Sequence, residues 1–146
     1  MANDPKDVII GEIQNIVSKM LGGSAGALMR RAGMNASYKI WPELPPDKSI
    51  MEAGEIMKKG VQGLGGFGEF SIVADDHGVA KIEFVGCYFA SLTKDSGKPC
   101  GQQPICYFGF GLVEETFKRL TGLTTKVELV DRADGQEICF ETATPR

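Results

Sequence analysis

The sequence has few of the residues on which most catalytic and metal sites depend. Histidine occurs once, as His77, between Asp76 and Gly78 in a stretch typical of an exposed turn. A single histidine excludes zinc-protease motifs, which need two, and a Ser–His–Asp triad at any other position. No two cysteines have the C-x-x-C spacing, so cysteine spacing alone is a weak metal signal.

Positive charge in excess and long apolar runs are also missing. The formal net charge is −3, whereas a dedicated nucleic-acid surface is usually basic. No apolar run reaches membrane-spanning length, and the first residues, MANDPKD, carry acids where a signal peptide has positive charge. We therefore expect a cytoplasmic protein that binds no nucleic acid and has no membrane span, a setting in which structural disulfides are uncommon.

The composition that remains is that of one folded domain. The chain has 146 residues, of which 42% are hydrophobic and 24% are charged. That length can bury a substantial core, and both fractions are ordinary for a globular protein. We expect residues 1–146 to form a single domain.

Helix signals dominate the first half of the chain. Asp4-Pro5-Lys6-Asp7 is typical of a helix start. Ser24 can cap a second helix that ends near Gly33, and Ser49 to Glu52 has the pattern of a capping box before a third. The first of these helices carries an apolar stripe that consists of Ile9, Ile13, Ile16, Val17 and Met20.

A change to period two then predicts a first β-hairpin. Residues 67–75 and 79–87 are the expected strands, joined by a short loop at residues 76–78. This register places Ile72 opposite Ile82 and Phe70 opposite Phe84, so one face of the hairpin is apolar.

A second hairpin is expected at the end of the chain. Its strands are residues 125–131 and 136–142, with a turn at Asp134-Gly135. A two-residue turn pairs Leu129 with Phe140, and Arg132 with Glu137.

The clearest helix lies between the two hairpins and ends before Gly122. Its apolar face consists of Ile105, Phe108, Leu112, Phe117 and Leu120. The order of elements is then three helices, a hairpin, a long helix and a hairpin. That order predicts an α+β fold with N-terminal helices and an antiparallel sheet made of two hairpins, rather than alternating β-α-β units.

The cysteines suggest chemistry by their positions. Cys87 alternates with Phe84 and Ile82, and Cys139 alternates with Phe140, so both are expected off the main apolar faces of their strands. Cys106 lies at the start of the long helix, where a thiolate is favoured. A zinc or iron–sulfur site is chemically allowed, and scattered unligated thiols are the alternative. The candidate metal ligands are Cys87, Cys100, Cys106 and Cys139.

Two other patterns have plainer interpretations. Gly63 to Gly68 matches G-x-G-x-x-G, but a dinucleotide site needs a strand before it and a helix after it, and here the order is reversed. We therefore expect a helix-to-strand turn there. Glu128 and Asp131 are close in sequence, yet nothing identifies a catalytic partner, and solvated strand ends are the commoner case.

Three stretches resemble the 4-vinyl reductase, or hydrocarbon-binding, domain. They are the N-terminal helix pair with Gly22-Gly23, the run from Cys106 to Gly122, and the closing hairpin. That family belongs to a superfamily with vesicle-trafficking-complex subunits and ligand-sensing regulator domains. The family hairpin carries Glu-x-x-Cys, three residues, Gly, three residues and Cys. Glu128, Gly135 and Cys139 match this motif, but Asp131 stands at the first cysteine.

The resemblance implies an α+β ligand-binding fold, commonly a homodimer, with a cavity for a small and often apolar molecule. The cavity is expected between the helices and the sheet, lined by Phe70, Phe84, Phe108 and Leu112, each of which is equally suited to an ordinary core. In several relatives the tail cysteines hold a metal. Here Asp131 supplies an oxygen ligand, or Cys87 and Cys100 replace the missing cysteine, or the metal is gone.

Three functional hypotheses follow. The first is a small-molecule-binding or sensing domain, and the second is a metal or redox protein with zinc or an iron–sulfur cluster. The third is a scaffold subunit whose helices contact a protein partner. No residue is assigned a catalytic role, and the sequence does not name the ligand.

Overall fold

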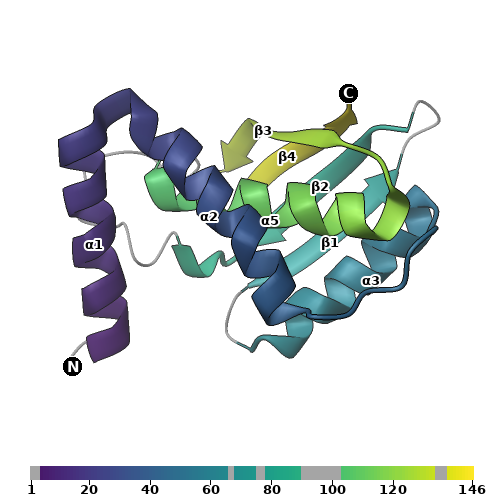
Figure 1. The fold of residues 1–146 in the computed structure, drawn as a ribbon, viewed down its shortest axis with the longest axis horizontal. Helices are drawn as coiled ribbons and strands as arrows, with labels where there is room; N and C mark the ends of the chain where they lie inside the picture. Colours follow the sequence, from purple (N-terminus) through teal and green to yellow (C-terminus); the bar gives the residue numbers. More distant parts are fainter. Residues whose placement is uncertain (1–3, 66–67, 75–77, 90–102, 134–137) are drawn as a thin grey trace.

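The chain folds into helices and one four-stranded antiparallel sheet, as the computed structural model shows (Figure 1). The structure describes residues 4–65, 68–74, 78–89, 103–133 and 138–146. The elements are α1 (Pro5–Leu21), the 3-10 turn η1 (Gly22–Ser24), α2 (Ala25–Ile40), α3 (Ile50–Gly63), β1 (Glu69–Ala74), β2 (Ala80–Val85), α5 (Pro104–Thr121), β3 (Thr125–Ala133) and β4 (Ile138–Pro145). The predicted α+β class, with a long helix between two hairpins, is confirmed.

Helices cover one side of this arrangement in two tiers (Figure 1). α3 packs against β1, α5 packs against β3, and α2 lies along α5. The core forms where α3 and α5 meet the strands, around the fully buried side chains of Phe70, Phe117 and Leu120. No helix in the described ranges has the length and apolar character needed to cross a membrane.

Local capping explains where the helices begin and end. Asp4 accepts a hydrogen bond from the Lys6 backbone N–H at 2.8 Å, so α1 begins as predicted. Ser49 and Glu52 form the reciprocal capping box of α3. Gly122, at φ 78°, ends α5 in the left-handed conformation that glycine adopts without strain.

The expected end of α2 near Gly33 is wrong, because the helix continues to Ile40. Gly33 serves close helix packing instead. A Cβ on Gly33 would lie 1.9 Å from the Phe108 carbonyl oxygen of α5, and one on Gly111 would lie 1.9 Å from the Arg30 carbonyl oxygen of α2. Glycine on both helices therefore permits their backbones to touch.

The sheet has the order β1-β2-β4-β3. In the first hairpin Phe70 pairs with Phe84 and Ile72 with Ile82, which confirms the predicted register. The Phe70 and Phe84 rings pack edge to face, with their centroids 5.7 Å apart.

The predicted register of the second hairpin is wrong. Leu129 pairs with Glu141 rather than Phe140, and Arg132 pairs with Cys139 rather than Glu137. Leu129 is one residue out of the predicted register and Arg132 is two, because an irregularity between Leu129 and Asp131 adds one residue to β3, as a β-bulge does. The predicted turn at residues 134–135 lies outside the described residues.

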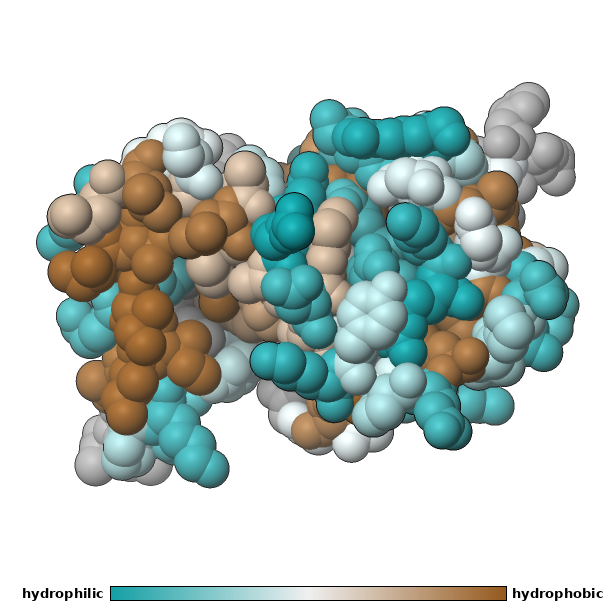
Figure 2. All heavy atoms as spheres, viewed as in Figure 1, coloured by the Kyte–Doolittle hydropathy of each residue, from teal (hydrophilic) through white to brown (hydrophobic). Residues whose placement is uncertain are grey.

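Helix α1 stands at one end of the molecule, coloured purple in Figure 1. Only Gly11 and Gln14 of its 17 residues are buried. The hydroxyl of Tyr88, which follows β2, donates a hydrogen bond to the Asp7 carboxylate. The apolar stripe predicted for this helix faces outward and is visible as a brown band in Figure 2.

Candidate functional site

An apolar cavity of about 40 Å³ lies in the core between α5 and the sheet. Side chains from helices, from strands and from the segment after β2 line it. The residues are Val61 of α3, Phe70, Phe84, Cys139 and Glu141 of the strands, Cys106, Gly109, Leu112 and Val113 of α5, and Cys87 and Phe89 after β2. Nearly all of these side chains are apolar or weakly polar, and Glu141 contributes the one carboxylate among them.

Three of the four predicted ligand-binding residues line this cavity, namely Phe70, Phe84 and Leu112. Phe108 does not. Its ring packs edge to face against Phe89, with centroids 5.9 Å apart, so it supports the cavity wall from behind. The sequence did not predict that Phe89 lines the cavity. Phe89 lies beyond the predicted strand, where no periodicity indicates which way a side chain points.

Cys106 and Cys139 are buried and Cys87 is half-buried, and all three line the cavity. The expectation that Cys139 points away from the core is wrong. Cys139 lies on the inner face of β4, together with the buried Ala143, and it pairs with Phe84 of β2. Because directly paired residues of neighbouring strands share a face of the sheet, the core face of β4 is that of Cys139 rather than that of Phe140, which the sequence pattern did not show.

The predicted orientation of Cys87 also fails, for a different reason. Strand β2 ends at Val85, and Gly86 at φ 62° turns the chain before Cys87. Strand alternation therefore no longer applies at Cys87, and its side chain reaches the cavity. The fourth candidate, Cys100, lies outside the described residues.

The two carboxylates at the positions that resemble the hairpin motif differ from these cysteines in burial. Glu128 and Asp131 are exposed, whereas Cys139 is buried. Glu128 pairs with Lys126 at 2.8 Å, and the hydrogen bond from that ammonium lowers the pKa of the Glu128 carboxyl. In the part of the chain that the structure describes, no three Cys, His, Asp or Glu side chains are grouped to hold a metal ion.

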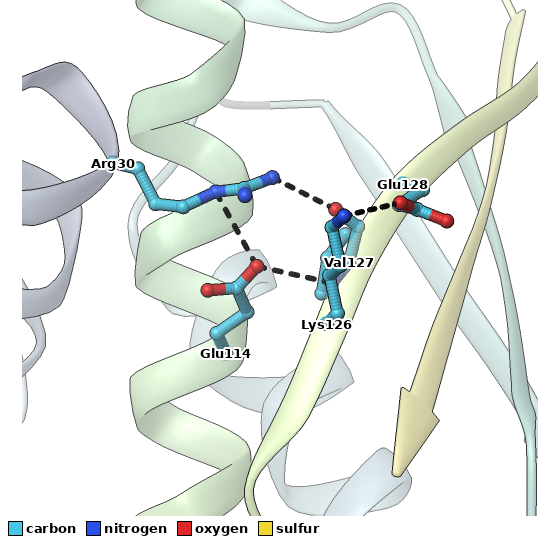
Figure 3. Close-up of polar contacts among 5 residues, drawn as sticks. All are labelled: Arg30, Glu114, Lys126, Val127 and Glu128. Atoms are coloured by element: carbon cyan, nitrogen blue, oxygen red, sulfur yellow. Dashed lines mark hydrogen bonds and ion pairs between the residues drawn. The ribbon is translucent and has the colours of Figure 1, made fainter. Parts of the chain in front are cut away.

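A wider hollow of about 390 Å³ opens beside α5 and β3, lined in part by Arg30, Tyr107 and Lys126. Figure 3 shows that its charges are already balanced. Arg30 approaches Glu114 at 3.4 Å and donates to the Val127 carbonyl oxygen at 3.0 Å, while Lys126 pairs with Glu128. Arg30 and Lys126 therefore stabilise the packing of α2, α5 and β3 rather than form a site for an anion.

The glycine-rich run before β1 follows a helix and precedes a strand, as expected. Gly68 has φ 116°, and a Cβ there would lie 2.6 Å from the Phe84 ring and 2.9 Å from the Gly86 carbonyl oxygen. Close approach of the chain accounts for this glycine without a nucleotide.

No family model matches the chain, and no curated protein sequence matches it. Solved structures do match. The phenol-responsive sensory domain of the transcription activator PoxR, solved with phenol, has a TM-score of 0.68 and 12% identity over 95% of this chain and 74% of its own. An H-NOX structure from work on H-NOX activation has a TM-score of 0.60 and 15% identity over 100% of this chain and 75% of its own.

A second H-NOX structure, from work on heme distortion, has a TM-score of 0.55 and 15% identity, covering 100% of this chain and 74% of its own. Identities this low establish similarity of fold alone. The chain thus has an α+β fold similar to those of the PoxR sensory domain and of H-NOX domains.

Proposed function

We propose that this chain is a small-molecule-binding or sensing domain whose ligand enters the cavity beneath α5. The observation that carries the proposal is the cavity itself, which has an apolar wall with the rings of Phe70, Phe84 and Phe89. Apolar pockets with a few polar groups are the usual sites for small ligands. The similar fold of the PoxR sensory domain, solved with phenol, supports the same class of function.

The size of the cavity restricts the ligand. A volume of about 40 Å³ is well below that of an engineered core cavity of about 150 Å³ that binds benzene. A ligand would therefore displace side chains as it enters, so we propose a small, monocyclic apolar molecule. Glu141 on the cavity wall would accept a hydrogen bond from a ligand hydroxyl.

A substitution at Gly109 tests this site. Gly109 lines the cavity, and a Cβ there would lie 3.3 Å from the Phe89 ring. Alanine also favours a helix interior over glycine by about 1 kcal/mol, so Gly109→Ala fills the cavity with little loss of stability. We expect phenol binding, measured by calorimetry, to weaken about tenfold or more, since an added methyl must be displaced.

The matched control is Gly63→Ala on α3, where a Cβ would meet nothing within 4 Å. Its affinity for phenol should equal that of the unmodified chain. Equal affinities in all three proteins would place the ligand elsewhere. If the unmodified chain binds neither phenol nor benzene, the proposed ligand class is wrong.

The convergence of Cys87, Cys106 and Cys139 on one cavity supports a second candidate, in which cysteine sulfurs bind a soft metal such as zinc or an iron–sulfur cluster. The described residues alone do not fit such a site. Native mass spectrometry of protein purified without oxygen tests it. Metal that is present in the unmodified chain and lost in both Cys106→Ser and Cys139→Ser would support this candidate, and metal-free protein would contradict it.

A further inference from the structure

The exposed face of α1 carries an apolar stripe that the rest of the described chain leaves uncovered (Figure 2). We call its four residues the α1 stripe: Ile9, Ile13, Ile16 and Met20, which are 58%, 59%, 56% and 78% exposed. With only Gly11 and Gln14 buried, α1 gains little from packing on its own chain. A lone helix of this length is marginal in water, so its stability calls for a further contact.

The spacing of the stripe indicates what that contact is. Its residues are separated by four, three and four positions, which is the a/d repeat of a coiled coil. Such a repeat forms a narrow seam that packs against another helix, with each side chain inserted between residues of the facing helix.

Charges beside the stripe indicate which helix fits. Glu12 and Lys19 are both exposed, lie seven residues apart and flank the stripe on the same side. Neither forms an ion pair with any residue that the structure describes. A second α1 in the antiparallel direction would bring its lysine to Glu12 and its glutamate to Lys19.

We propose that the α1 stripe is the contact between two copies of this chain, whose α1 helices pack antiparallel about a two-fold axis. Ile13 then meets the partner subunit's Ile16, and Ile9 meets the partner subunit's Met20. Each Glu12 faces the partner subunit's Lys19, so the interface is self-complementary, as two-fold symmetry requires. A parallel pair would instead place Glu12 beside the partner subunit's Val17 and form no such ion pair.

A membrane surface fits the stripe less well. Interfacial helices carry lysine and arginine on their polar face, whereas α1 has Lys6 and Lys19 balanced by Asp7 and Glu12.

The proposed dimer interface is modest in size. A helix of 17 residues is about 25 Å long. One face of such a helix buries less than the roughly 800 Å² that each partner buries in a standard interface. We therefore expect a dissociation constant in the micromolar range.

Sedimentation equilibrium of the full chain tests the surface. The unmodified chain should form dimers as its concentration rises through the micromolar range, and Ile13→Asp should weaken the dimer at least about tenfold, because a carboxylate enters the seam. Ile13 is exposed in the monomer, so circular dichroism and the melting temperature measured at low concentration should stay unchanged. Val73→Asp, at a position of similar exposure on β1, is the matched control and should leave the dimer intact.

Charge exchange tests the direction of the helices. Glu12→Lys alone should weaken the dimer, and the double variant Glu12→Lys with Lys19→Glu should restore it. A dimer that is indifferent to both changes would contradict antiparallel packing. A chain that stays monomeric, or a dimer that Ile13→Asp does not affect, would overturn the proposal.

Two rival occupants have their own readouts. Sedimentation of the chain with phosphatidylserine vesicles that Ile13→Asp abolishes, without any dimer, would assign the stripe to a membrane surface and overturn the proposal. A stable complex with a different protein, and no dimer, would favour the scaffold hypothesis in the same way. The phenol-binding measurements do not depend on this stripe, so failure of one proposal leaves the other standing.

Discussion

At the scale of single residues, Tyr88 connects α1 to the wall of the cavity. Its neighbours Cys87 and Phe89 line the cavity, and its hydroxyl donates to Asp7 of α1. That hydrogen bond, together with burial and the negative charge of Asp7, raises the pKa of Tyr88 to about 12. Because the bond requires the protonated phenol, it ties the docking of α1 to the protonation state of one side chain.

This coupling predicts how stability changes at alkaline pH. The pKa of Tyr88 is raised from 10.0 in the unfolded chain to about 12 in the folded one, so its contribution is complete below pH 10 and is lost as pH rises toward 12. Tyr88→Phe should cost about 1 kcal/mol at neutral pH, the net value of a partly exposed hydrogen bond. It should also flatten the fall in stability between pH 10 and 12, measured by urea unfolding.

The comparison for this prediction is Tyr38, a more exposed tyrosine whose hydroxyl donates to Glu115, and that hydrogen bond raises the pKa of Tyr38 as well. Because solvent weakens an exposed contact, Tyr38→Phe should flatten the fall in stability less than Tyr88→Phe does. If the two variants flatten it equally, the Tyr88 contact is not its main source.

At the scale of elements, the crossing of α2 and α5 depends on two glycines. Gly33 and Gly111 each face a backbone carbonyl of the opposite helix, at 1.9 Å from where a Cβ would lie. A backbone atom cannot rotate away as a side chain can, so the helices would have to separate.

Alanine at either glycine should therefore destabilise the fold. Overpacking a core costs about 1–3 kcal/mol, and a clash with backbone is expected at the upper end or beyond, which outweighs the gain of about 1 kcal/mol in helix propensity. Guanidinium unfolding of Gly33→Ala and Gly111→Ala measures this loss.

Gly26→Ala is the control on the same helix pair, since its Cβ would meet only the Tyr107 ring, at 3.4 Å. It should be neutral or stabilising. Similar stabilities for all three variants would mean that α2 and α5 are not in backbone contact.

At the scale of the whole molecule, Glu114 joins three elements (Figure 3). From α5 it accepts a hydrogen bond from the Val127 N–H of β3 at 3.0 Å and lies 3.4 Å from the Arg30 Nε of α2. That Nε is buried and has no hydrogen-bond partner among the described residues, so the Glu114 carboxylate is the negative charge that compensates it, beside the rings of Tyr107 and Phe110. The outer helix tier is thereby connected to the sheet through one carboxylate.

Glu114→Gln tests this connection. The amide oxygen still accepts from Val127, but Arg30 loses its negative partner. Breaking a buried ion pair costs about 3–5 kcal/mol, and because the Arg30 side chain is 22% exposed we expect about 2 kcal/mol in thermal or denaturant unfolding. Glu128→Gln, which breaks the exposed pair with Lys126, should show no measurable loss. Equal losses in the two variants would contradict a special role for Glu114.

Features that depend on neighbours along the chain could be predicted from the residue types. The Asp4 cap, the Ser49 capping box and the Gly122 terminus satisfy backbone groups within one turn, so residue types alone predict them. The register of the first hairpin follows in the same way, because a short loop and two alternating strands leave one pairing that buries Phe70 and Ile82 together.

Features that depend on contacts with distant segments could not be predicted in this way. In the sequence Gly33 has the pattern of a helix end, because its contact with Phe108 of α5 is not visible there. The pairing of β4 with β2 places Cys139 on the same face as Phe84, and the turn at Gly86 ends strand alternation before Cys87, so neither cysteine could be placed from periodicity alone. The sequence shows that α1 is amphipathic, but it does not show whether the rest of the chain covers its apolar face. In the structure only Gly11 and Gln14 of α1 are buried. Periodicity shows that a face is apolar, and only packing shows what covers it.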